Sequence, residues 1–138
     1  MTGRMRRAAA IDAKSRVASA AHGPIWKDRA VELADYQRLS RRTAEYPREA
    51  WLAYPALGLA GEAGEVAEHA KKAIRDDSGH VTEERRAAMA KELGDVLWYV
   101  AQIASELGLD LEQIAGTNLQ KLLSRQQRGV LSGSGDDR

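Results

Sequence analysis

Apolar residues recur at steps of three or four along residues 89–107, and this spacing restricts the fold more than any other feature of the chain. Such steps place side chains on one face of an α-helix. The run comprises Met89, Leu93, Val96, Leu97, Val100, Ile103 and Leu107. Strand signals are absent from the sequence, because no stretch alternates steadily and no hairpin dipeptide separates β-branched runs. We therefore expect an all-α fold, an antiparallel bundle of four main helices.

Prolines and turn residues delimit the first two helices. A thin apolar face spans about residues 27–45, and Pro47 should end that segment because its ring cannot continue a helix. Pro55 suits the first turn of a second helix, since its φ is fixed near the helical value. The sequence after Asp76 is rich in Asp, Ser and Gly, which predicts the end of that helix.

Capping residues delimit the last two helices. Thr82 can serve as the N-cap of the third helix, and Gly108 can end it. Asp110 and Gln113 form a variant capping box for the fourth helix. Gly and Ser become frequent after Arg128, so the fourth helix should end there.

Composition narrows the class of protein. A chain of 138 residues, 43% hydrophobic and 30% charged, is typical of one soluble globular domain. The formal net charge of +1 gives no overall field for nucleic acid or an anionic membrane, so we expect neither as a partner. The absence of cysteine excludes disulfides and thiolate chemistry and fits a cytoplasmic location. No apolar run approaches the roughly 20 residues of a membrane span.

The two ends of the chain differ from the rest. Residues 1–24 contain five basic residues and one acidic residue, and residues 129–138 are rich in Gly and Ser. Such compositions are common in flexible termini, although an Arg-rich start also resembles an organelle transit peptide. We therefore expect a basic arm over residues 1–24, one helical domain over residues 25–128 and a flexible tail over residues 129–138.

Four acidic residues are placed so that they can meet between two helices. Glu62 and Glu65 are three residues apart, which puts both on one side of the second helix. Glu92 and Asp95 repeat this spacing on the third helix, which can run back antiparallel to the second. Converging carboxylates repel one another unless a hard cation lies among them, and Mg²⁺ prefers oxygen ligands. The spacing therefore favours a metal site.

A solvated acidic face would show the same spacing, because glutamate is a good helix former. The second acid pair, however, borders the apolar run of the third helix, which favours a partly buried site. Small residues such as Gly58, Gly61 and Gly64 lie beside the first pair, and each glycine costs a helix about 1 kcal/mol. We expect these residues to let the two helices approach closely.

The stretches "GLAGEAGEVAE" and "KELGDVLWYVAQIASELGLDLEQIAGTNLQKLLSRQQRG" resemble the MazG-like nucleotide pyrophosphohydrolases of the all-α NTP pyrophosphatase superfamily. The signature of that family is Glu-x-x-Glu, a spacer and Glu-x-x-Asp. It is matched here by Glu62, Glu65, Glu92 and Asp95. The resemblance runs from about Asp35 to Arg128.

The resemblance implies hydrolysis of a nucleoside or deoxynucleoside triphosphate to the monophosphate and pyrophosphate, as nucleotide-pool house-cleaning. It implies that Mg²⁺, with Mn²⁺ as a substitute, is held by the four acids of the signature. Glu62 or Glu65 would then be the catalytic base. It also implies a homodimer or homotetramer, whose assembly would complete the bundle.

The resemblance also suggests substrate contacts. Asn118 and Lys121 fit the family's Asn-x-x-Lys, and Arg125 lies one turn further along the last helix. Tyr99 lies one turn beyond Asp95 and should face the metal side. Lys121 and Arg125 can alternatively be ordinary surface cations near a helix C-terminus.

Large aromatic residues precede the first acid-bearing helix. Tyr46, Trp51 and Tyr54 could close over a nucleobase, but core or subunit contacts explain them equally well. For Trp98 we expect core or interface packing.

Three other functions explain part of the sequence. A di-iron carboxylate bundle needs Glu-x-x-His on two helices, and the sequence lacks that motif. A phosphoribosyl-ATP pyrophosphohydrolase would share the bundle and the metal-binding acids. A non-enzymatic helical regulator associated with nucleic acid would use the basic arm of residues 1–24, but it would leave the four acids unexplained.

Overall fold

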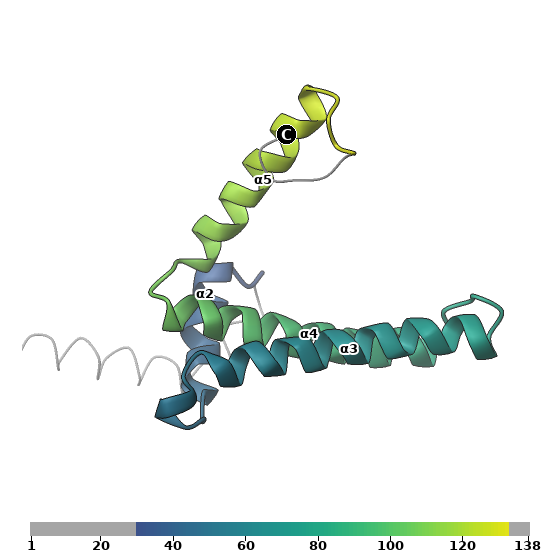
Figure 1. Ribbon diagram of the computed structural model, residues 1–138, viewed down its shortest axis with the longest axis horizontal. Coiled ribbons are helices and arrows are strands. Elements are labelled where there is room, and N and C mark those ends of the chain that lie inside the picture. The colour runs from purple at the N-terminus through teal and green to yellow at the C-terminus, as the bar shows by residue number, and fades with distance from the viewer. Residues whose placement is uncertain (1–29, 133–138) are drawn as a thin grey trace, which may run out of the picture. The chain divides into compact units, whose positions relative to one another are not determined.

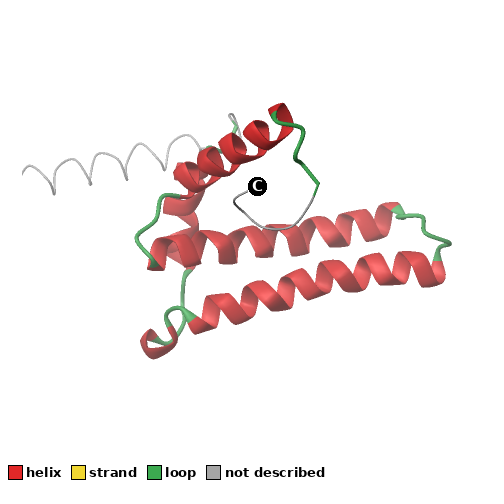
Figure 2. Cartoon of the chain, turned by 45° about the horizontal axis from the view of Figure 1, so that its top comes forward, coloured by secondary structure: helices red, strands yellow, loops and turns green. Residues whose placement is uncertain are grey.

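The computed structural model describes residues 30–132, and every regular element in this range is helical (Figures 1 and 2). The elements are α2 (Leu33–Ser40), η1 (Arg41–Thr43), η2 (Arg48–Ala50), α3 (Ala53–Asp76), α4 (Glu83–Glu106) and α5 (Leu111–Gln127), where η marks a 3-10 helix. All belong to one compact unit that begins at Leu33. The predicted all-α class is confirmed. None of the described helices is both long and apolar enough to cross a membrane.

Two predicted segments lie wholly or mostly outside the described residues. They are the basic arm of residues 1–24 and the tail of residues 129–138, of which residues 133–138 are not described.

α3 and α4 run side by side in opposite directions in both views (Figures 1 and 2). Gly79 in the turn between them has a φ of 84°, and its N–H donates to the Ala73 carbonyl at 2.9 Å. Thr82 caps α4 as predicted, since its hydroxyl accepts from the Arg85 N–H at 3.2 Å. The Arg85 side chain also forms an ion pair with Asp77. These local contacts place the two acid-bearing helices next to each other.

α5 begins where the sequence predicted. Gly108, with a φ of 66°, follows the end of α4. The Asp110 carboxylate then accepts from the Gln113 N–H at 2.9 Å, which is the expected cap.

Gln37 on α2 joins three helices through its side-chain amide. The amide nitrogen donates to the Ser105 hydroxyl at 3.1 Å and to the Leu109 carbonyl at 2.9 Å. The amide oxygen accepts from the Leu111 N–H at 2.9 Å. One side chain therefore holds α2 against the end of α4 and the start of α5.

The first helix is shorter than the predicted segment of residues 27–45. Within the described range it begins at Leu33 and ends at Ser40, after which the chain tightens into η1. The Thr43 hydroxyl donates to the Ser40 carbonyl at 2.7 Å and accepts from the Trp98 side-chain N–H at 2.8 Å. Such side-chain bonds compete with a continuing α-helix, and here they draw the chain onto α4.

The apolar face of α4 is only partly covered. Small residues dominate the buried core, which contains Ala73, Ala101, Ala104 and Leu111. Leu93 and Leu97, which belong to the predicted core stripe, keep 54% and 37% of their surface exposed. α3 is the long helix that packs beside α4, and one such partner covers only part of an amphipathic face. In a single chain the predicted stripe is therefore half open.

Candidate functional site

Three of the four predicted acids meet between α3 and α4. Glu62 projects from α3 and Glu92 and Asp95 from α4, and one carboxylate oxygen of each lies within 4.8 Å of the other two. Glu62 and Glu92 are half-buried, and Asp95 is exposed. Ligand oxygens at 2.0–2.1 Å from Mg²⁺ lie about 3 to 4 Å apart in an octahedron, so a small contraction of this cluster would suit the ion. Carboxylate oxygens are also the ligands that Mg²⁺ and Mn²⁺ prefer.

The three carboxylates are electrostatically unfavourable neighbours. Burial raises the pKa of Glu62, and the charges of Asp95 and Glu92 raise it further. A hydrogen bond with Glu92 acts in the same direction. A cation among these oxygens would favour the ionised forms, so the electrostatics of the cluster suit metal binding.

Glu65 lies beside this cluster and not inside it. It is exposed and lies one helical turn along α3 from Glu62. Its charge makes a smaller contribution to the raised pKa of Glu62. The predicted set of four acids is thus arranged as three converging carboxylates with a fourth beside them.

Tyr99 of α4 lies across α3 at Gly58. A Cβ atom at Gly58 would lie 2.2 Å from Cζ of the Tyr99 ring, which is far inside van der Waals contact. A side chain at this position would therefore force the Tyr99 ring to move, and the prediction of close helix approach is confirmed there. A Cβ atom at Gly61 or Gly64 would meet nothing within 4 Å, so within a single chain the same prediction was wrong for these two residues.

Two tyrosines lie near the acids. The pKa of Tyr99 is raised by burial first, and then by Tyr54 and two carboxylates of the cluster. The pKa of Tyr36 is raised by burial and then by the charge of Asp95, to which α2 brings it close. The sequence predicted Tyr99 from its one-turn spacing to Asp95. It missed Tyr36, because no spacing within one helix relates α2 to α4.

A pocket of about 510 Å³ lies at the C-terminal end of α4. Its lining residues are Arg41, Ala44, Tyr46, Arg48, Trp51 and Glu106. The Tyr46 ring stacks on Tyr54, with ring centroids 5.4 Å apart and planes at 16°. Tyr54 in turn lies near enough to Tyr99 to raise its pKa. Tyrosine side chains therefore connect this pocket with the acid cluster.

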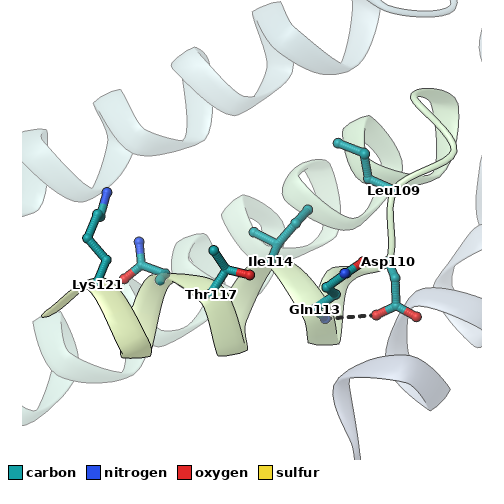
Figure 3. A pocket seen from close by; sticks show the side chains of 7 residues that line it. Leu109, Asp110, Gln113, Ile114, Thr117 and Lys121 are labelled. Carbon is teal, nitrogen blue, oxygen red and sulfur yellow. Dashed lines mark hydrogen bonds between the residues drawn. The ribbon is translucent and has the colours of Figure 1, made fainter. Parts of the chain in front are cut away.

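Asn118 and Lys121 line a separate hollow of about 360 Å³ along α5 (Figure 3). Its other lining residues are Leu109, Asp110, Gln113, Ile114 and Thr117. Figure 3 shows Ile114, Thr117 and Lys121 projecting from the same side of the helix. The three clustered acids do not line this hollow within the described chain. Arg125 is buried, with 5% of its surface exposed, so a single chain does not present it to a substrate.

The chain is similar to known proteins over most of its length. The family model described as "MazG nucleotide pyrophosphohydrolase domain" matches residues 55–130. The "Gene 37 protein" of Mycobacterium phage L5 is 47% identical over 109 residues, which cover 75% of this chain and 96% of that protein. No solved structure matches the chain. The range matched by the family model contains all four predicted acids, whereas Tyr46 and Trp51 precede it.

Proposed function

Because this chain belongs to the MazG nucleotide pyrophosphohydrolase family, we propose that it hydrolyses nucleoside or deoxynucleoside triphosphates to the monophosphate and pyrophosphate. The observation that carries the proposal is the convergence of Glu62, Glu92 and Asp95 inside the matched range. Carboxylates that raise one another's pKa weaken a helix pair unless a cation binds them. We assign the activity to nucleotide-pool house-cleaning in the cytoplasm.

The converging carboxylates would hold Mg²⁺, or Mn²⁺ in its place, with Glu65 beside them. When bound, the ion supplies charge neutralisation for the triphosphate and lowers the pKa of a nearby water. The residues of the chain orient the triphosphate and accept a proton. Glu65 is the first candidate for the base, because it lies outside the converging group, and Glu62 is the second.

The reaction forms one bond and breaks another at the α-phosphorus. The oxygen of water attacks this atom while a glutamate carboxylate takes the proton. The bond from the α-phosphorus to the oxygen that bridges it to the β-phosphorus breaks, and pyrophosphate leaves. In-line geometry of this kind needs a triphosphate held firmly at one end and a nucleoside held at the other.

The nucleoside end would lie along the tyrosines that lead from the acids to the pocket. Tyr99 lies beside the acids, and Tyr46 and Trp51 line the pocket at the end of α4. Aromatic rings accept bases by stacking, with little dependence on the base. Trp51 and Tyr54 keep 43% and 44% of their surface exposed, so they are accessible to a ligand.

A second copy of the chain would complete the site. Lys121 suits a positively charged contact to the polyphosphate, and Asn118 suits a polar contact to the sugar or to water held by the metal. The hollow that these two residues line does not include the acids. Exposed leucines offer apolar surface for assembly on three helices: Leu57, Leu93, Leu97, Leu119, Leu122 and Leu123. A homodimer or homotetramer therefore remains part of the proposal. We leave Arg125 out of the substrate contacts because it is buried.

A panel of canonical and modified nucleoside triphosphates, each incubated with Mg²⁺, tests the reaction. Pyrophosphate and the monophosphate are the expected products, because water attacks the α-phosphorus. Orthophosphate as the sole product would mean that a different bond is cut, and it would overturn the proposal.

Two variants test the site. Asp95→Asn and Glu62→Gln remove one charge each with little change in size, and each should lower kcat/KM by about 100-fold or more because the metal contact weakens. Glu84→Gln is the matched control, since Glu84 is exposed on the same helix as Asp95 and lies outside the cluster. Circular dichroism checks that all three remain helical. Wild-type turnover by Asp95→Asn would contradict the metal assignment.

A further inference from the structure

A closed set of hydrogen bonds joins the end of α4 to the segment that carries Tyr46. The Glu106 Oε1 atom accepts from the Tyr46 hydroxyl at 2.6 Å and from Arg41 Nη2 at 2.5 Å. The Tyr46 hydroxyl also accepts from Arg41 Nη1 at 2.5 Å. Each of the three side chains is bonded to both of the others, so none of them can turn alone without breaking two bonds.

Gln102 anchors this set one helical turn before Glu106. It is completely buried, and its Oε1 atom accepts from Arg41 Nη1 at 3.4 Å. Its Nε2 atom donates to the Ser40 hydroxyl at 3.2 Å. Residues four apart on a helix lie on one face, so two successive turns of α4 fix the Arg41 guanidinium.

The Tyr46 ring is the part of this network that faces other aromatic groups. It stacks on Tyr54, and the Arg41 guanidinium carbon lies 5.7 Å from the centre of the Tyr46 ring. Tyr46, Arg41 and Glu106 all line the 510 Å³ pocket. The Glu106 side chain is only 14% exposed, and both of its hydrogen bonds go to other lining residues. This environment suits a residue that holds its neighbours in place.

We propose that Glu106 is a positioning residue for the nucleoside end of the substrate. It holds the Tyr46 ring and the Arg41 guanidinium as a preformed wall against which base and sugar bind. A wall that is fixed beforehand loses little side-chain freedom on binding, which raises affinity for a nucleoside. This inference rests on the proposed pyrophosphohydrolase function. The acids that act on the triphosphate lie outside this network, so Glu106 governs substrate binding and not bond cleavage.

Glu106→Gln in the full chain tests the inference, because it keeps the size of the side chain and weakens both charge-assisted bonds. KM and kcat are measured with Mg²⁺ on the best nucleoside triphosphate of the panel. KM should rise about tenfold while kcat stays within about twofold of wild type. Tyr46→Phe, which removes only the hydroxyl, should change KM in the same direction. Glu84→Gln is again the matched control.

Two further measurements separate positioning from a general structural defect. Inorganic tripolyphosphate has no base or sugar, so its inhibition constant should be the same for Glu106→Gln and wild type. Binding of the nucleoside monophosphate, measured by isothermal titration calorimetry, should weaken by about the same factor as KM rises. If Glu106 had only a structural role, the substitution would weaken the binding of tripolyphosphate and of the nucleoside monophosphate together.

The outcomes distinguish this inference from the proposed function. Wild-type KM in Glu106→Gln and in Tyr46→Phe, with an active wild type, would overturn the inference and leave the function standing. The inference would also be overturned if Glu106→Gln lowered kcat and weakened inhibition by tripolyphosphate to the same extent. If the wild type releases pyrophosphate from no nucleotide, the proposed function fails. In that case the inference is overturned as well if Glu106→Gln binds the nucleoside monophosphate as tightly as the wild type does. If the circular dichroism of Glu106→Gln shows that this variant is no longer helical, the same KM and binding measurements on Tyr46→Phe test the inference.

Discussion

Two glycines of α3, Gly58 and Gly61, differ in the space that a side chain would find at each position. The ring of Tyr99 occupies the space that any side chain at Gly58 would need, whereas Gly61, one turn further along α3, faces open space. Tyr99 in turn lies beside the acids. The absence of a side chain at Gly58 of α3 therefore makes room for the Tyr99 ring of α4 in the candidate site.

Gly58→Ala should destabilise the protein by about 1 to 3 kcal/mol, even though alanine is the better helix former, because its Cβ overlaps the Tyr99 ring. Gly61→Ala is the matched control in the same helix, and it should stabilise by about 0.4 to 1 kcal/mol because its Cβ meets nothing within 4 Å. Urea unfolding followed by circular dichroism measures both changes. Equal effects of the two substitutions would contradict the contact between Gly58 and Tyr99.

Glu106 should make stability depend on acidic pH. Hydrogen bonds from Tyr46 and Arg41 lower its pKa, so the folded chain favours the ionised carboxylate. This contribution is complete above the pKa of an unfolded glutamate, about 4.3, and is lost as the pH falls through the lower folded value. The free energy of unfolding of the wild type should exceed that of Glu106→Gln at about pH 7, and the difference should shrink as the pH falls below the pKa of an unfolded glutamate. A difference that does not vary with pH would speak against the assigned bonds.

At the scale of elements, capping residues and apolar spacing predicted the helices. Polar contacts between residues far apart in the sequence determine how the helices pack. The starts of α4 and α5 follow from N-caps at Thr82 and Asp110, whose side chains accept from backbone N–H groups three residues further on. Gln37 instead binds Ser105, which is 68 residues away in sequence, and no local pattern marks such a pair. Tyr36 and the network of Glu106 were missed in the sequence for the same reason.

Gln37→Ala should destabilise the protein by about 1 to 3 kcal/mol, because the Leu111 N–H and the Leu109 carbonyl lose their partner. Amide hydrogen exchange should rise at the start of α5. Arg38→Ala is the neighbouring control, since its exposed ion pair with Asp35 should contribute less than about 0.5 kcal/mol. Unchanged exchange at Leu111 in Gln37→Ala would show that this side chain does not hold the junction.

At the scale of the whole molecule, one chain leaves large apolar side chains uncovered. Leu57 of α3 keeps 73% of its surface exposed, and Leu119 and Leu123 of α5 lie on one face with more than half of theirs exposed. Periodicity predicted an apolar face over residues 89–107, and in a single chain that face is only partly covered. It could not predict what covers that face, because the spacing of residues within one chain carries no information about a second copy. The same limit applies to Asn118 and Lys121, whose spacing predicted a shared face but not its distance from the acids.

Light scattering should give the mass of a dimer or tetramer for the wild type at micromolar concentration. The double variant Leu119→Glu with Leu123→Glu should shift the protein towards the monomer, because it places charge on an exposed apolar face. Gln120→Glu, an exposed position on the same helix, controls for added charge. A wild type that is monomeric and fully active would contradict the proposed assembly.

The α3–α4 hairpin is restrained on both sides of the three converging carboxylates. Arg85 and Asp77 tie the turn at one end, and Tyr99 rests on Gly58 at the other. Between these fixed points the carboxylates repel. If the proposed divalent ion binds these carboxylates, its removal should widen the helix spacing beside the acids, and its return should narrow that spacing, while both restraints stay in place. Such an arrangement would let the proposed site open and close by a local change in width, without any hinge between rigid bodies.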